Sequence, residues 1–223
     1  MNIILVYLLM LVLPLIASIN IKRTYKKYKK VLNKNGMTGS IVARQILDNN
    51  GLTNVAVYEQ NGILSDHYDP TKKAVVLSSD IYKGATVAGM AVAAHECGHA
   101  VQDQVNYPWM RFRTAIVPIV NIGERLAYII LFISLILAWY ELTILAIILT
   151  GLGLVFQLIT LPVEVNASAR AIRMLQEYGM VDRSEYRGAK KVLKSAALTY
   201  IAGVLSSALN IVYLFLRFGS RRD

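Results

Sequence analysis

The chain has 223 residues, of which 55% are hydrophobic and 17% charged, and its formal net charge is +10. A chain this apolar is not an ordinary soluble domain, and its composition predicts an integral membrane protein. The basic residues gather beside apolar segments and form no stripe with aromatic residues. We therefore expect them to meet anionic lipid headgroups of the bilayer and not nucleic acid.

The first predicted element is a transmembrane anchor at residues 1–21. Residues 3–19 are almost entirely apolar, which is just long enough to cross a hydrocarbon core of about 30 Å. A cleaved signal peptide is the alternative, but the basic run at residues 22–30 follows where a small-residue cleavage site would be needed. An uncleaved helix is the better interpretation.

Residues 22–113 are predicted to form a small α+β domain behind a basic segment. We expect a helix over residues 38–48, capped by Thr38, and strands over residues 53–59 and 74–78. A helical approach then begins at Ser79 or Asp80. It leads to the most informative motif of the chain.

That motif is the pentad His95-Glu96-Cys97-Gly98-His99, an H-E-x-x-H pattern. On a helix, His95 and His99 lie one above the other and can offer two imidazole nitrogens to one Zn²⁺ ion. Glu96 beside them can act as the general base of peptide hydrolysis. A buried histidine pair without a metal is the alternative.

Cys97 is the single cysteine, which rules out an internal disulfide and fits a reducing compartment. Its thiol is either a small inert filler or redox-sensitive. We favour the filler, because many residues fit this position of the motif.

The second half of the chain predicts more membrane helices. Residues 114–163 are predicted to form a transmembrane hairpin. Its first helix should begin near Thr114, and its second span is the uncharged run Leu142–Val163. Residues 164–197 form a cytoplasmic helical segment. Residues 198–223 form a fourth transmembrane or interfacial segment with a basic tail.

The distribution of Lys and Arg predicts the orientation. Of 24 such residues, thirteen lie within 22–113 and seven within 170–194, so both segments should be cytoplasmic. The short turn at Glu141 is then outside. Arg217, Arg221 and Arg222 fit this rule poorly if the fourth segment crosses fully, so a re-entrant or partly interfacial segment is the alternative.

A zinc hydrolase needs a third protein ligand, and we predict Glu164. Two crossings separate it from His99, which returns it to the same side of the membrane. The alternative for Glu164 is a carboxylate at a helix start, favoured by the helix dipole. His67 is the rival ligand, although its strand-and-turn setting better suits a substrate contact, an ambiguity that Tyr68 shares.

Three segments together resemble the bacterial membrane-bound neutral zinc metallopeptidases of the YugP type. They are Asp66-His67-Tyr68-Asp69-Pro70, the stretch Ala93–Ala100 around the pentad, and Pro162-Val163-Glu164-Val165-Asn166-Ala167-Ser168. A more distant similarity is to the HtpX-like and CAAX prenyl proteases. Those gluzincins also place a membrane hairpin between the pentad and a Glu-x-x-Ala-Asp ligand motif.

The chain departs from that wider pattern at Ser168, where the gluzincins have an aspartate that orients a zinc-bound histidine. A neutral hydroxyl raises histidine basicity less than a carboxylate does. Asn166 or Asp103 could supply the contact instead. Candidates for stabilising the oxyanion of the reaction are Arg170, Tyr200, His67 and Tyr68.

The sequence thus predicts a membrane α-helical bundle of about four spans with a small α+β, zincin-like catalytic domain. The predicted function is a zinc-dependent endopeptidase of the cell membrane, with a cytoplasmic site and membrane proteins or peptides as substrates. The alternative is a non-catalytic scaffold or assembly factor with structural zinc, which would need a fourth protein ligand from His67 or Cys97.

Overall fold

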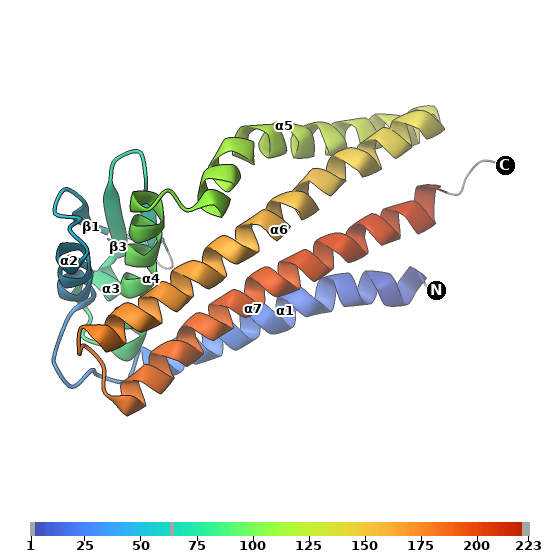
Figure 1. Ribbon diagram of the computed structural model, residues 1–223. Helices are drawn as coiled ribbons and strands as arrows, with labels where there is room; N and C mark the ends of the chain where they lie inside the picture. Colours follow the sequence, from blue (N-terminus) through green and yellow to red (C-terminus); the bar gives the residue numbers. More distant parts are fainter. Residues whose placement is uncertain (1–2, 63–64, 220–223) are drawn as a thin grey trace. The chain divides into compact units, whose positions relative to one another are not determined.

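The computed structural model describes residues 3–62 and 65–219, so Arg221 and Arg222 of the predicted basic tail lie outside the described residues. Figure 1 shows the elements coloured and labelled in chain order. The chain divides into two compact units, one apolar and helical and one that contains a sheet. The described parts of Met1–Ser18, Arg111–Pro162 and Leu198–Asp223 form the apolar unit, and those of Ile19–Met110 and Val163–Ala197 form the sheet unit.

Four long helices supply the apolar unit. They are α1 (Ile3–Tyr28), α5 (Pro108–Leu137), α6 (Tyr140–Glu177) and α7 (Arg183–Leu214), the last followed by a π-helical turn at Phe215–Gly219. Each is long and apolar enough to cross a membrane. Together with the small sheet, they confirm the predicted fold class.

Many apolar side chains of these helices are exposed on the protein surface. Ile4, Phe132 and Ile148 are each about two-thirds exposed, at 64%, 66% and 65%. Water around so many such side chains would carry a large hydrophobic cost, whereas lipid tails carry none. A polar side chain of this unit bonds to a neighbouring helix instead, because Ser206 Oγ of α7 donates to the Met10 carbonyl of α1 at 2.7 Å.

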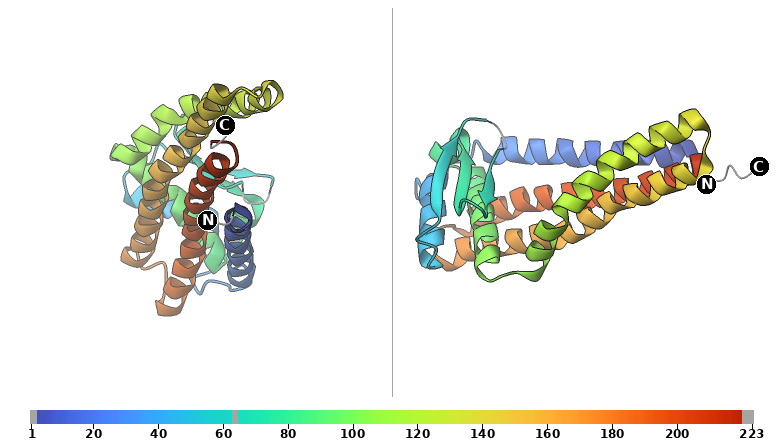
Figure 2. Two further views of the ribbon diagram at one scale, coloured as in Figure 1. Left: turned by 90° about the vertical axis from the view of Figure 1, so that its right-hand side faces the viewer. Right: turned by 90° about the horizontal axis from the view of Figure 1, so that it is seen from above.

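The sheet unit has three strands in the order β1-β3-β2. Figure 2 shows the same chain in two further views. Strand β3 (Ala74–Ser78) lies in the middle, parallel to β1 (Ala56–Gln60) and antiparallel to β2 (His67–Asp69). Three helices, α2 (Gly39–Asn49), α3 (Ser79–Lys83) and α4 (Val87–Gln104), complete the unit. Helix α4 packs on α2 and also contacts β2 and β3, so it runs through the middle of the core.

Local sequence explains where the two main helices begin. The Thr38 hydroxyl accepts a hydrogen bond from Ile41 N at the start of α2, as predicted. Thr86 caps α4 in the same way, accepting from Gly89 N at 3.0 Å. Helix α4 is therefore a separate helix and does not continue the helix that starts at Ser79, because α3 ends before Gly84.

Two other predicted boundaries were wrong. The first strand begins at Ala56 and not at residue 53, because Thr53 and Asn54 form a turn. Helix α5 begins at Pro108, six residues before Thr114. Proline is favoured at the first position of a helix, and the polar first turns hide the helix from a search based on apolar runs.

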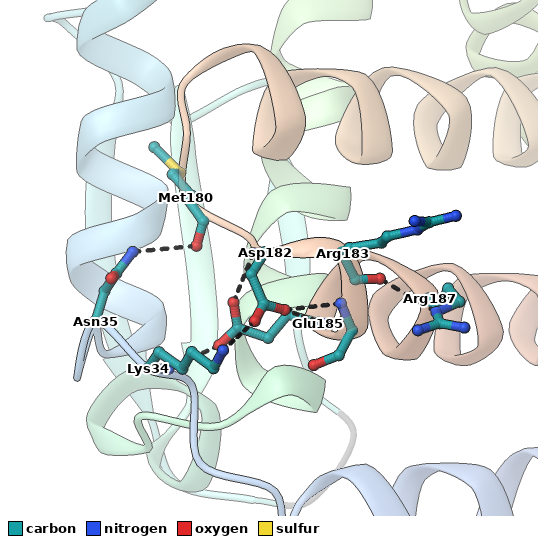
Figure 3. A network of polar contacts seen from close by, with 8 residues as sticks. Lys34, Asn35, Met180, Asp182, Arg183, Glu185 and Arg187 are labelled. Atoms are coloured by element: carbon teal, nitrogen blue, oxygen red, sulfur yellow. Dashed lines mark hydrogen bonds and ion pairs between the residues drawn. The ribbon is translucent and has the colours of Figure 1, made fainter.

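A polar network ties the loop after α1 to the start of α7 (Figure 3). Asp182 Oδ1 accepts from the backbone N–H groups of Ser184 and Glu185, and Glu185 Oε2 accepts from Asp182 N, which makes a reciprocal capping box. Glu185 Oε1 also accepts from Lys34 N at 2.7 Å, and the Lys34 ammonium pairs with Asp182. The network therefore joins two segments of the sheet unit that are far apart in the sequence.

We expect this network to stabilise the fold in a pH-dependent way. The hydrogen bond from Lys34 and the two backbone N–H groups hold the pKa of Asp182 below its ordinary value. The stabilisation is therefore complete above the unfolded-state pKa of about 3.9 and is lost as the pH falls through the lower folded-state pKa. Thermal unfolding in detergent should show wild type more stable than Asp182→Asn at neutral pH, with the difference shrinking below about pH 4.

Asn at this position can still cap the helix, so the comparison isolates the charge. The matched control is Asp48→Asn, which removes a half-exposed carboxylate paired with Arg44 one turn away in α2. A difference for Asp182→Asn that is the same at every pH would contradict the assignment.

Candidate metal centre

Helix α4 carries two histidines on one face. His95 and His99 are one turn apart, and their rings meet edge to face with centroids 4.8 Å apart. His95 is partly buried and His99 is buried. The pair is thus held in the core of the sheet unit with restricted access to solvent.

Gly98 allows α6 to approach this face closely. A Cβ atom at Gly98 would lie 2.6 Å from the carbonyl oxygen of Ala167, so any larger residue would push the helices apart. The part of α6 that follows Val163 therefore lies directly against the pentad. This contact explains the glycine in the motif.

Glu164 reaches the histidines from α6. Its Oε2 lies 3.2 Å from His95 Nε2 and 3.6 Å from His99 Nε2, and its side chain is buried. One ligand atom from each of the three residues lies within 4.8 Å of the other two. Glu164 sits in the middle of α6, so its alternative interpretation as a carboxylate at a helix start was wrong.

These separations fit a bound metal ion. Nitrogen and oxygen ligands about 2.0–2.1 Å from a tetrahedral zinc ion are about 3.3 Å apart, close to both distances from Glu164 Oε2. Imidazole nitrogens and a carboxylate oxygen are also ligands that zinc accepts. The residues present can therefore hold such an ion.

The Nδ1 atom of each histidine, the ring nitrogen that does not face Glu164, has an uncharged hydrogen-bond partner. His95 Nδ1 shares a hydrogen bond with Ser168 Oγ at 3.2 Å, and His99 Nδ1 lies 2.9 Å from Gln102 Oε1. Ser168 therefore contacts the histidine although it is not an aspartate. Asn166 and Asp103 were the two residues predicted to supply this contact in place of an aspartate. Asn166 accepts a hydrogen bond from Gln102, and Asp103 accepts one from Tyr68.

Gln102 is the residue that the sequence analysis missed. It is completely buried, and its Nε2 donates to the Val163 carbonyl at 2.8 Å and to Asn166 Oδ1 at 3.1 Å. A backbone carbonyl only accepts, so the amide nitrogen must face Val163 and the amide oxygen must face His99. Its spacing of three residues after His99 places it on the same helix face, which is the signal that could have found it.

This orientation fixes the protonation of His99. Because Gln102 Oε1 can only accept, Nδ1 of His99 carries the proton and Nε2 presents its lone pair toward Glu164. A lone pair and a carboxylate oxygen repel each other unless a cation lies between them. Without an ion, a proton on Nε2 takes this place. Although burial would lower the pKa of His99, the hydrogen bond from protonated Nε2 to Glu164 and the nearby charge of Glu96 raise it, so the site favours positive charge.

Glu96, the predicted general base, is buried beside this cluster and acts on His99 through its charge. The neighbouring Cys97 is also buried, and its Sγ lies 3.5 Å from the Ala43 carbonyl of α2. Burial raises the pKa of its thiol above the ordinary range. Cys97 thus packs as an inert filler, turned toward α2.

The other predicted residues are more scattered. His67 is exposed on β2, with Nδ1 2.8 Å from the Ser65 carbonyl, and among the described residues it is not part of the three-residue cluster. The Tyr68 hydroxyl donates to Asp103 Oδ2 at 2.8 Å, and Lys73 pairs with the same carboxylate. Arg170 Nε donates to Asn166 Oδ1, and Tyr200 belongs to the apolar unit.

Comparisons with known proteins agree with this chemistry. The sequence model of the family described as "Putative neutral zinc metallopeptidase" matches residues 3–219. The "Putative membrane protease YugP" of Bacillus subtilis (strain 168) is 41% identical over 207 residues, which cover 93% of this chain and 92% of the relative. No solved structure matches.

Replacing Gln102 should weaken metal binding. The change Gln102→Leu removes the hydrogen-bond partner of His99 Nδ1 and the side-chain bond to the Val163 carbonyl. Loss of such an outer contact typically lowers metal affinity by about 10–100-fold. Competition with a chromophoric chelator would measure the affinity for Zn²⁺. The matched control is Gln104→Leu on the exposed side of α4, whose amide donates to the Asn50 carbonyl. Equal affinities in the two variants would contradict the role of Gln102.

Proposed function

Since this chain belongs to the neutral zinc metallopeptidase family, we propose that it is a membrane-integral zinc endopeptidase. It hydrolyses peptide bonds of membrane proteins or peptides at the cytoplasmic face. His95, His99 and Glu164 hold the zinc ion, and Glu96 is the catalytic base.

The observation that carries this proposal is the number of ligands. Among the described residues, the cluster offers three donor groups, and Cys97 is turned toward α2. Structural zinc sites are usually closed by four protein ligands, whereas catalytic sites have three and leave one position for water. The three-ligand cluster therefore favours catalysis over the scaffold with structural zinc.

The chain's own residues have separate tasks in this reaction. When bound, zinc supplies a Lewis acid that activates water and polarises the peptide carbonyl. Glu96 takes the proton of the attacking water and passes it to the leaving amine. Gln102 and Ser168 hold the two imidazole rings in the orientation that presents Nε2.

Strand β2 supports binding of an extended peptide. It lies at the edge of the sheet, bonded to β3 alone in the strand order, and it contacts α4. A substrate strand can add to such an edge through backbone hydrogen bonds. Of the candidates for stabilising the oxyanion, exposed His67 and partly exposed Arg170 suit a substrate contact better than Tyr68, which is buried on Asp103.

We expect Glu96→Gln to abolish cleavage without removing the metal. Gln keeps the size of the side chain but cannot accept the proton, and loss of a general base costs about 10²–10⁴-fold in rate. The measurement is zinc content together with cleavage of a mixed peptide library by purified protein, with a chelator as control.

Glu164→Gln is the matched comparison, because it should lose the zinc as well as the activity. Unchanged activity of Glu96→Gln would exclude Glu96 as the base. Zinc without cleavage in the wild-type protein would favour the structural-zinc scaffold.

The orientation can be tested at Glu141, in the first turn of α6. The bias of Lys and Arg toward residues 22–113 and 170–194 predicts that this turn is outside the cell. The variant Glu141→Cys should react with a membrane-impermeant maleimide on intact cells. Buried Cys97 gives a low background, since burial raises its thiol pKa. Labelling only after the cells are broken would reverse the proposed topology.

A further inference from the structure

A large groove lies between α6 and α7 within the sheet unit. Its volume is about 810 Å³, which is within the roughly 300–1,000 Å³ of small-molecule sites. One wall is the part of α6 from Val165 to Glu177, and the other is the part of α7 from Tyr186 to Ala197. Neither the predicted ligands nor Glu96 line it.

The polarity of the groove changes along its length. The two helices run in opposite directions in sequence, so Val165 and Ala197 mark the same end, and each is next to an apolar segment of the chain. Ala169 and Leu193 continue this apolar lining. Further from the apolar segments the lining carries Arg173 and Lys190, with Glu177 and Tyr186 at the far end. Lys194 lies beside Leu193, nearer the apolar end, and adds a third cation on a long side chain.

The cations of the groove are not neutralised by the protein. Of the residues that the structure describes, none forms an ion pair with Arg173, Lys190 or Lys194. Lys190 instead lies over the ring of Tyr186, with Nζ 5.8 Å from its centroid. Three cations against the single carboxylate of Glu177 leave the lining with a net positive charge.

We propose that this groove binds one anionic phospholipid. The phosphate contacts Arg173, Lys190 and Lys194, and an acyl chain follows Ala169 and Leu193 toward Val165 and Ala197. Along α6, the order from Val165 and Ala169 to Arg173 matches the order of tail and headgroup in a lipid that enters from the cytoplasmic leaflet of the proposed topology. Basic pockets between membrane helices commonly select anionic headgroups on this side.

The groove also touches the candidate metal centre through one residue. Ser168 lines the groove, and its hydroxyl bonds His95 Nδ1 at 3.2 Å. A lipid in the groove therefore lies behind the His95 ring, on the side away from Nε2. The proposal does not depend on the protein being a peptidase, because lipid binding requires neither zinc nor Glu96.

Native mass spectrometry of the full chain in detergent tests this proposal with phosphatidylglycerol and phosphatidylcholine of equal acyl length. We expect wild type to retain one phosphatidylglycerol, with an affinity at least about tenfold above that for phosphatidylcholine. The triple variant Arg173→Gln/Lys190→Gln/Lys194→Gln should lose this preference.

The matched control is Arg183→Gln/Arg187→Gln/Lys191→Gln, which removes the same charge from exposed positions of α7 outside the groove lining. It should bind like wild type, and an equal loss in both triple variants would overturn the proposal in favour of general attraction between charges. Ala169→Phe keeps every charge but fills the apolar part, so it should also lower the affinity. Displacement of the lipid by inorganic phosphate at equal concentration would show a phosphate site and contradict a lipid site.

Discussion

The close packing of α4 on α6 at Gly98 is the contact on which the candidate metal centre depends. Only a residue without a side chain lets the Ala167 backbone come this near, and Glu164 then lies one turn away from that point, opposite both histidines. Gln102 also links the two helices, because it bonds His99 on its own helix and the Val163 carbonyl on α6. The glycine sets the separation of the helices, while the glutamine sets their register and the ring orientation.

The neutral partners of the histidines give this centre a distinct charge. In a histidine with a carboxylate behind it, the imidazole gains basicity and passes negative charge toward the ion. Here a hydroxyl and an amide take that place, so within the cluster that the structure describes Glu164 is the one candidate ligand that brings negative charge. A divalent ion held by two neutral imidazoles and one carboxylate would keep a net positive charge, which would strengthen its attraction for a water molecule.

Much of this arrangement could be predicted from the sequence, because it follows from local patterns. The pentad places two candidate ligands on one helix face, Thr38 marks a helix start, and long apolar runs mark the membrane helices. What could not be predicted depends on contacts between distant segments. The role of Gln102 requires knowing that the Val163 carbonyl lies opposite, and the start of α5 was missed because its first turns carry Arg111 and Arg113 among apolar residues. The groove between α6 and α7 likewise has no signature in either helix alone.

The division of the metal ligands between α4 and α6 also has a consequence for biosynthesis. His95 and His99 leave the ribosome before the apolar segments of α5 and α6, and Glu164 follows only after both. A nascent chain therefore holds an incomplete ligand set until the hairpin has been synthesised and α6 has docked on Gly98. The order of the segments along the chain couples completion of the centre to membrane insertion, so an unassembled chain cannot carry the finished site.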